Sequence, residues 1–313
     1  MILEDFLIKN EVGLFCKYGN FYLDPQQPVP LAIISHAHAD HAIRGNKVVY
    51  CTLATAEFMK HRYKKFAADE FNILPYNDDF QVNGIKVTFV SAGHILGSAQ
   101  ILMEYNGVRY LYTGDYKLQS DATCEPYTFV KADVLITETT FADPNIKHPD
   151  PIDEIKKLNA ERINIMLGAY ALGKSQNIIR LINDHCVGKN ILLHHSIYPF
   201  AKIYENFGID LGKYSIYDRK VMKNNPGGNV YIVPPMVFNS YHKAINVKKA
   251  FASGWSRLQQ GNEIELYISD HGDWLDLLKV IENTNPQQIW TLHGDGKPLQ
   301  NYLKQKREVK ILN

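Results

Sequence analysis

Three histidines and one aspartate crowd into six consecutive positions of the sequence. The stretch "ISHAHADHA" places His36 and His38 two residues apart, with Asp40 and His41 side by side. In an extended or turning backbone, His36 and His38 can point to one side while Asp40 and His41 are offset toward another. Neutral imidazoles and a carboxylate, without cysteine, are ligands expected for Zn²⁺ and compatible with Mn²⁺ or Fe. The spacing therefore predicts a site for two metal ions, and the alternative is a surface turn whose histidines are satisfied locally.

Four further residues able to bind a metal ion follow apolar runs that have the character of strands. They are Asp24 in "FYLDP", His94 in "SAGHILGS", Asp115 in "YTGD" and His293 in "TLHGDG". Taken singly, each has an ordinary explanation, because an aspartate at the end of a strand is a common turn former. Together with the histidine turn, they match the order and spacing of one known scaffold.

The predicted secondary structure that would hold these residues changes along the chain from short strands to alternating helices and strands. Up to residue 148, short β-branched and aromatic runs alternate with turn residues, and Asn106-Gly107 is the signature of a two-residue hairpin. From "PIDEIKKLNAER" onward, helical stretches alternate with strands such as "INIMLGAY" and "NVYIVPP", which is typical of an α/β unit with a parallel sheet. After "EIELYISDH" the pattern predicts a helix, a strand, and a final helix and strand. We therefore expect a mixed fold of α+β and α/β parts.

Composition limits the class of protein. The chain has 313 residues, of which 45% are hydrophobic, so it can bury a full core, and its length favours about two domains. No apolar run approaches the ~18 residues of a membrane span, and the first residues do not have the pattern of a signal peptide. The four cysteines show no CxxC spacing that would indicate disulfides or a thiolate zinc site. We expect a soluble cytoplasmic protein with no membrane partner.

The formal net charge is +1, but the charged residues are unevenly distributed along the chain. Residues 150–262 contain 15 Lys and Arg against 8 Asp and Glu, so this segment is basic and the remainder is acidic. A basic segment beside an acidic one is what a protein that handles a polyanion near metal ions would have. An uneven scatter of surface lysines would give the same count, so charge alone leaves both interpretations open.

The predicted metal ligands resemble those of a known fold. In chain order, the residues that resemble its motifs are Asp24, His36, His38, Asp40, His41, His94 and Asp115. The fold is that of the metallo-β-lactamases, an αββα sandwich whose two-metal site lies at one edge. Glu138 in "ITETTF", His271 in "ISDHGDW" and His293 in "LHGDG" resemble the motifs that define its β-CASP nuclease branch. The stretches "GAYALGKSQ" and "FASGW" are similar to those of the bacterial DNA ligase-associated exonucleases within that branch.

This resemblance extends over nearly the whole chain and implies two domains. Residues 1–148 and 263–313 would form the αββα metallo-β-lactamase sandwich. Residues 149–262 would form an inserted α/β β-CASP domain that caps the metal site, and the basic segment would coincide with this insertion. The insertion is short for the branch.

The resemblance also implies a set of metal ligands. The first ion would be held by His36, His38 and His94, and the second by Asp40, His41 and His293. Asp115 would bridge the two ions. Asp24 would fix the histidine turn, in keeping with the general need to orient imidazoles that bind a metal ion.

Two divalent ions about 3.5 to 4 Å apart activate water and neutralise the oxygens of a phosphodiester. The resemblance assigns protonation of the leaving sugar oxygen to His271, held by Glu138, and includes Asp40 among the catalytic residues. A histidine beside a carboxylate holds its proton more firmly, which suits an acid near neutral pH. The activity implied is that of a DNA exonuclease in DNA repair, with two ions, Zn²⁺ or alternatively Mn²⁺, and with a DNA ligase or a helicase as partner.

The stretch "GAYALGKS" formally satisfies the phosphate-binding pattern G-x-x-x-x-G-K-[ST] between a strand and a helix. The side chains inside this loop are bulky, and no apolar strand ends in the carboxylate that would complete a nucleotide site. We therefore expect Lys174 and Ser175 to hold a backbone phosphate of nucleic acid at the start of the helix. Trp255 in "FASGW" is a candidate for stacking on a base, with packing between the domains as its alternative.

Three other functions fit parts of the sequence. A ribonuclease of the same branch would use the same residues, and DNA is preferred only through the subgroup resemblance. A small-molecule metallo-hydrolase would need the histidine turn but neither the basic insertion nor the pair Glu138 and His271. A binding subunit without metal ions is disfavoured because every ligand position holds a competent residue.

Overall fold

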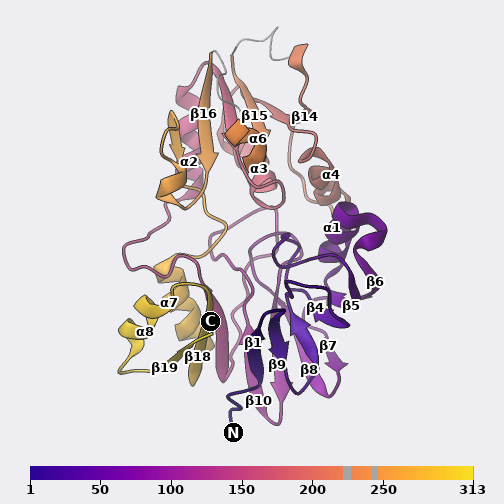
Figure 1. Ribbon diagram of the computed structural model, residues 1–313. Coiled ribbons are helices and arrows are strands. Elements are labelled where there is room, and N and C mark those ends of the chain that lie inside the picture. Colours follow the sequence, from indigo (N-terminus) through magenta and orange to yellow (C-terminus); the bar gives the residue numbers. More distant parts are fainter. Residues whose placement is uncertain (221–226, 241–245, 313) are drawn as a thin grey trace. The chain divides into compact units, whose positions relative to one another are not determined.

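The structure is a computed structural model that describes residues 1–220, 227–240 and 246–312 (Figure 1). The chain divides into two compact units. The first consists of residues 1–120, 124–147 and 271–313, and the second of residues 121–123 and 148–270. The second unit is therefore an insertion in the sequence of the first.

The first unit opens with a six-stranded sheet in the order β1-β2-β3-β4-β5-β6. Strands β1 to β3 are antiparallel, and β3 to β6 are parallel. The strands are β1 (Leu7–Asn10), β2 (Gly13–Cys16), β3 (Phe21–Leu23), β4 (Leu31–Ile33), β5 (Asn46–Cys51) and β6 (Ala68–Ile73). Helix α1 (Leu53–Tyr63) and the short η1 (Lys64–Phe66) connect β5 to β6, and Thr52 caps α1 by accepting a hydrogen bond from Thr55 N. The sequence pattern did not predict this helix.

A second sheet of seven strands has the order β19-β18-β11-β10-β9-β8-β7. Strands β7 to β10 are antiparallel, and β10, β11, β18 and β19 are parallel. The strands are β7 (Asp79–Val82), β8 (Ile85–Ser91), β9 (Ala99–Tyr105), β10 (Val108–Tyr112), β11 (Val134–Thr139), β18 (Gln288–Gly294) and β19 (Glu308–Ile311). The predicted hairpin is confirmed, because Asn106 and Gly107 both have positive φ and join β9 to β10 with Tyr105 opposite Val108.

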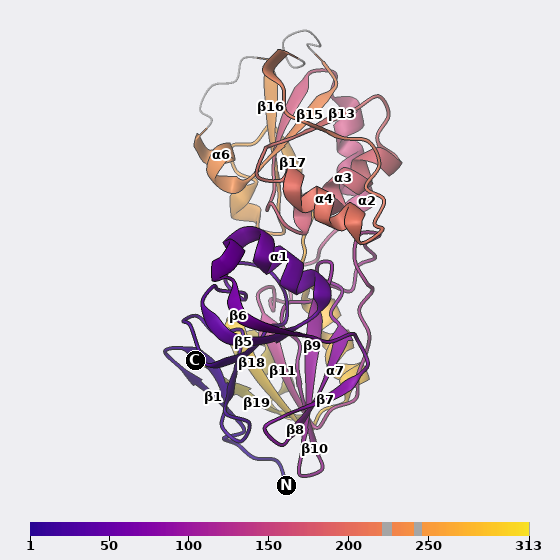
Figure 2. The ribbon, with the colours of Figure 1, turned by 90° about the vertical axis from the view of Figure 1, so that its right-hand side faces the viewer.

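The two sheets of the first unit pack face to face. Their shared core contains Phe21 and Ile33 from one sheet and Phe89, Tyr110 and Trp290 from the other. Helices α7 (Trp274–Thr284) and α8 (Lys297–Leu303) pack on the outer face of the seven-stranded sheet. Helix α1 packs through Ala56 and Met59 on the outer face of the six-stranded sheet, and Figure 2 shows it along β5 and β6. The unit is the αββα sandwich that the sequence predicts.

The second unit contains a sheet of six parallel strands in the order β14-β13-β15-β12-β16-β17. The strands are β12 (Asn164–Gly168), β13 (Asn190–Leu193), β14 (Ser215–Ile216), β15 (Asn229–Val233), β16 (Val247–Ala252) and β17 (Ile264–Leu266). The helices described are α2 (Pro151–Lys156), η2 (Lys157–Ala160), α3 (Lys174–His185), α4 (Tyr198–Asn206), α6 (Pro235–Ser240) and η3 (Ser256–Leu258). The parallel α/β arrangement is the one that the alternating pattern predicts.

The sequence placed the end of the insertion at residue 262, whereas the second unit continues to residue 270. The physical reason is strand pairing, since β17 bonds in parallel with β16 and so belongs to this sheet. In residues 1–220, 227–240 and 246–312, no helix is both long enough and apolar enough to cross a bilayer.

Candidate active site

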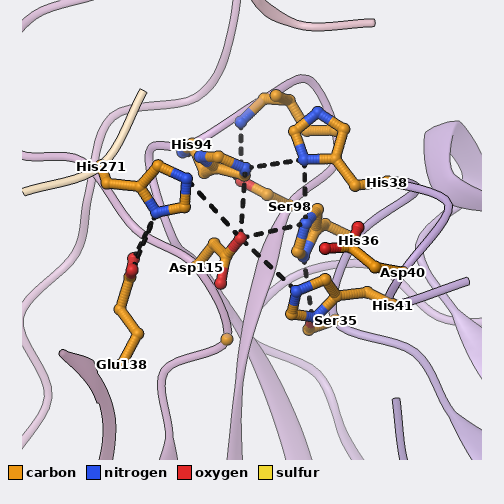
Figure 3. Close-up of polar contacts among 12 residues, drawn as sticks. Ser35, His36, His38, Asp40, His41, His94, Ser98, Asp115, Glu138 and His271 are labelled. Atoms are coloured by element: carbon orange, nitrogen blue, oxygen red, sulfur yellow. Dashed lines mark hydrogen bonds and ion pairs between the residues drawn. The ribbon is translucent and has the colours of Figure 1, made fainter. Parts of the chain in front are cut away.

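Four buried or half-buried donors converge in the first unit (Figure 3). His36, His38, His94 and Asp115 can each offer one ligand atom, and these atoms lie within 4.8 Å of one another. His38 Nδ1 is 3.2 Å from His36 Nε2 and 3.1 Å from His94 Nε2. Asp115 Oδ2 is 3.7 Å from His36 Nε2 and 3.8 Å from His94 Nε2. Ligands of a tetrahedral Zn²⁺ with bonds of about 2.0–2.1 Å lie about 3.3 Å apart, so the three imidazoles and the carboxylate fit a metal ion.

Strand direction explains why residues distant in sequence meet here. His36 follows β4, His94 follows β8, and Asp115 follows β10. In the seven-stranded sheet β8 and β10 run in the same direction because each is antiparallel to β9. Side chains just beyond their carboxyl ends therefore emerge at the same edge of the sheet.

The turn that carries Asp115 depends on Gly114. Its φ of +55° lies in the left-handed region, and a Cβ at this position would stand 2.8 Å from Ser35 Oγ. Ser35 in turn precedes His36 and lies 3.0 Å from His36 Nδ1 through its hydroxyl. A side chain at position 114 would therefore push apart the two loops that bring Asp115 to the histidines.

His41 approaches Asp115 from another side. Its Nε2 is 3.5 Å from Asp115 Oδ2, while its Nδ1 is 2.8 Å from Asp24 Oδ2. Asp24 also accepts hydrogen bonds from Ser35 N at 2.7 Å and from the Tyr112 hydroxyl at 2.9 Å. Asp24 thus fixes the orientation of the His41 ring and leaves Nε2 directed at Asp115, as carboxylates behind metal-binding imidazoles do.

The electrostatics of this cluster favour a cation. Burial and the neighbouring imidazoles lower the pKa of His36 well below its usual value, so its ring is neutral and able to bind a metal ion. Burial opposes ionisation of Asp115, but the surrounding histidines, His41 first, outweigh it and lower the pKa of this carboxyl. Burial also opposes a charge on His41, yet Asp115 and Asp24 raise its pKa to about 10. The field that holds a proton on His41 would equally favour a divalent ion at this place.

Buried Glu138 and half-buried His271 form a pair beside the metal donors. Glu138 is 4% exposed and lies near the end of β11, and its two oxygens are 3.0 and 2.8 Å from His271 Nδ1. It also accepts hydrogen bonds from Tyr116 N at 2.9 Å and from the Thr140 hydroxyl. His271 Nε2 is 3.9 Å from Asp115 Oδ2, so the second nitrogen of the ring faces the donors of the metal site.

Two predicted ligands, His293 and Asp40, lie outside the groups of closely spaced donor atoms among the described residues. The ring of His293 is 5.2 Å from that of His41, in a residue with φ of +51° at the exposed end of β18. Asp40 is exposed, and its carboxylate is among the charges that favour protonated His41. Neither residue belongs to the groups of three or more metal-capable side chains in the described part of the chain.

The nucleic-acid contacts expected at Lys174 and Ser175 do not match their surroundings. Lys174 is 3% exposed, and its Nζ donates to the Ile268 carbonyl at 2.6 Å and pairs with Asp270 at 3.3 Å. The Ser175 hydroxyl donates to Tyr170 O at 2.7 Å, and this side chain is fully buried. The loop amides are also used, since Gly173 N bonds to the Gln176 side chain. These groups have structural partners, so the expectation of a phosphate grip at this helix is corrected.

Trp255 differs from these two residues. Its side chain is half-buried, and the guanidinium of the exposed Arg257 lies 5.0 Å from the centre of its ring. An indole with a neighbouring cation retains the character of a surface on which a base could stack.

The sequence pattern also missed residues that orient the site. Ser35, Tyr112, Tyr116 and Thr140 bond to Asp24 or Glu138. Ser35 and Tyr116 adjoin predicted ligands, which is the only signal that the sequence offers for them.

Comparison with known proteins finds similarity to one group of nucleases. The model of the "Beta-lactamase superfamily domain" matches residues 19–168. The "Probable DNA ligase" of Opitutus terrae is 29% identical over 92% of this chain, and the match covers 29% of that protein. The "RNase J-like protein" of Methanocaldococcus jannaschii is 31% identical over 50% of this chain and 44% of its own length. Together, the matched domain and these relatives indicate a metallo-β-lactamase/β-CASP nuclease family.

A solved structure has a similar fold. A solved structure of a protein of unknown function from Enterococcus faecalis V583 has a TM-score of 0.61 over 90% of this chain and 79% of its own. At 16% identity, that similarity concerns the fold alone. The chain spans less than half the length of the two curated relatives named above.

Proposed function

We propose that this chain is a two-metal phosphodiesterase that degrades nucleic acid, acting on DNA from a strand end in DNA repair. The observation that carries the proposal is the shared position of Asp115 Oδ2. It lies 3.5 to 3.9 Å from nitrogens of His36, His94, His41 and His271. One carboxylate thus faces two sets of imidazoles and the Glu138–His271 pair.

The first ion is assigned to the donors that converge most closely, His36, His38 and His94, with Asp115. The second ion is assigned to His41 and Asp115, with His293 and Asp40 completing its ligands. Imidazole and carboxylate donors favour Zn²⁺, with Mn²⁺ as the alternative. When bound, such a pair of ions supplies an activated water and neutralises charge on the phosphodiester.

The protein itself supplies the proton for the leaving sugar oxygen. Glu138 holds His271 Nδ1, which orients the ring and stabilises its protonated form. The proton on Nε2 then faces the side of the site where Asp115 lies. A small-molecule hydrolase with activated leaving groups has no need of this pair, so its presence favours a substrate whose leaving alkoxide must be protonated.

DNA is favoured over RNA by the extent of similarity. The relative named as a DNA ligase aligns with 92% of this chain, whereas the RNase J-like relative aligns with 50%. The match covers 29% of the protein named as a DNA ligase, so most of that protein lies outside the region similar to this chain. We infer that this chain acts with a DNA ligase, or a helicase, in the cytoplasm, and trims ends before they are joined. RNA processing is the second candidate because relatives named as ribonucleases share the family.

The test is a comparison of substrates. Purified protein with Zn²⁺ or Mn²⁺ is offered end-labelled single-stranded DNA, duplex DNA and RNA of one sequence, with a chromogenic β-lactam as the small-molecule control. Release of mononucleotides from DNA ends, faster than from RNA, is expected. Internal cleavage of RNA would favour the ribonuclease. Hydrolysis of the lactam without any attack on nucleic acid would overturn the proposal.

A further inference from the structure

The residue that carries the proton in the proposed reaction lies in a segment without regular structure. His271 follows β17 and precedes α7, and residues 267–273 form neither helix nor strand. Its main chain must therefore be fixed by other contacts if its imidazole is to keep one position. We call residues 265–270 the connector, because they include the last two residues of β17 and lead on to this histidine.

Charged side chains of α2, η2 and α3 hold the connector. Lys174, at the start of α3, donates to the Ile268 carbonyl at 2.6 Å and pairs with Asp270 at 3.3 Å. Glu154, in α2, accepts a hydrogen bond from Tyr267 N at 2.8 Å. Lys157, just after α2, donates to the Glu265 carbonyl at 3.2 Å. Consecutive parts of the connector are thus each bonded to a charged side chain.

Burial strengthens the contact of Lys174 with Asp270. The side chains of Lys174 and Asp270 are 4% and 5% exposed, whereas that of Lys157 is 43% exposed. A buried charge that loses its partner is costly, so Lys174 and Asp270 fix each other's position far more firmly than a surface pair would. The residue held in this way is joined by a peptide bond to His271.

The chain is also fixed just beyond His271. Gly272 N donates to Tyr116 O at 2.8 Å, and Asp273 caps α7 by accepting hydrogen bonds from Leu275 N and Asp276 N. His271 is therefore a single residue between two anchored neighbours. We expect that removing one anchor would free the backbone on that side and allow the ring to leave its position at Glu138.

We propose that Lys174 is a positioning residue for His271, acting through its ion pair with Asp270. The inference rests on the proposed role of His271. This positioning role replaces the phosphate-binding role that the Gly-Lys-Ser pattern suggests. The buried ammonium group of Lys174 is bonded to the connector and is not accessible to a phosphate. Displacement of a catalytic group by about 1 Å costs on the order of 10²-fold in rate, which sets the expected effect.

The experiment compares Lys174→Met and Lys174→Arg with Lys189→Met as the matched control. Lys189 lies in the same unit and donates to a main-chain carbonyl, that of Glu161, but not to the connector. Single-turnover rates are measured on a DNA oligonucleotide and on bis(p-nitrophenyl) phosphate, whose leaving group needs no proton. Lys174→Met should lose roughly 10²-fold on the oligonucleotide and only a few-fold on the nitrophenyl ester. Lys174→Arg should restore most of the rate, and Lys189→Met should match the wild type.

A double mutant separates positioning from a general structural role. In the His271→Ala background, Lys174→Met should add no further loss on the oligonucleotide, because the group that it positions is absent. Equal losses on both substrates, or an additional loss in that background, would overturn the inference. If Lys174→Met does not fold, Asp270→Asn decides the question by the same two criteria. Failure of the proposed function shows separately, as equal losses on both substrates for His271→Ala alone.

Discussion

The histidine turn and the Gly-Lys-Ser loop both follow a strand and both match a chemical motif, yet their side chains meet opposite environments. In the turn, ring nitrogens of His36 and His38 converge with Asp115 and leave their ligand atoms directed at a common region. In the loop, Lys174 and Ser175 are buried and bonded to the main chain of their own unit. A motif thus predicts chemistry only where the fold leaves its polar atoms directed at a shared site.

Removal of Asp115 is the change expected to damage the turn most. Asp115→Ala should reduce nuclease activity below detection, because the same oxygen faces the donors of both proposed ions. Activity on labelled DNA and metal content per chain would be measured together. Asp5→Ala, which removes an exposed carboxylate paired with Lys17, is the control. Full activity of Asp115→Ala would show that hydrolysis does not need this carboxylate. The histidine turn would then differ from the Gly-Lys-Ser loop in geometry alone.

Removal of His271 should have the next largest effect. His271→Ala should retain both metal ions and lose roughly 10² to 10⁴-fold in turnover of DNA, the range for a positioned general acid. Glu138→Gln should lose less, because the imidazole remains and only its orientation and proton affinity change. Single-turnover rates and metal analysis would be compared with His61→Ala as a control. Loss of a metal ion from His271→Ala would instead make this histidine a ligand.

Replacement of Asp24 would test how strongly the histidine turn depends on the contact between this carboxylate and His41. Asp24→Asn should weaken metal affinity by about 10 to 100-fold, since the carboxylate that orients His41 is lost. Competition with a chromogenic chelator would measure the change. Tyr112→Phe, which removes one hydrogen bond to the same carboxylate, should have a smaller effect. Equal affinities in the wild type and Asp24→Asn would show that the turn is rigid without this carboxylate.

The smallest effect is expected for the charge at position 174 in DNA binding. Lys174→Met should leave the salt dependence of DNA binding unchanged, because its ammonium group is buried against Asp270. Arg257→Ala should reduce the slope of log K against log salt by about one, as for one lost phosphate contact. Fluorescence anisotropy with single-stranded DNA between low and moderate salt would measure both. A flatter slope for Lys174→Met would restore the phosphate-binding interpretation.

Much of the fold and of the site follows from local patterns. The hairpin at Asn106-Gly107 and the parallel sheet of the second unit are each set by neighbouring residues, through backbone conformation and through the alternation of strands and helices. The strand-end positions of Asp24, His94 and Asp115 are likewise visible in the sequence.

What the sequence could not supply depends on long-range pairing. Lys174 is buried because its partner Asp270, distant in the chain, lies beside it, and no local pattern records that contact. The end of the insertion was misplaced for a similar reason, since β17 joins the sheet through pairing with β16. The support that Tyr112 gives to Asp24 across 88 positions is equally invisible before folding.

The number of metal ions per chain decides whether Asp115 serves two ions or one. The apo protein would be titrated with Zn²⁺ or Mn²⁺, and bound metal by mass spectrometry would be compared with DNA hydrolysis in the same samples. We expect two ions per chain, with hydrolysis appearing only as the second ion binds, and one ion at most in His36→Ala. Full activity with a single bound ion, or with none, would contradict it.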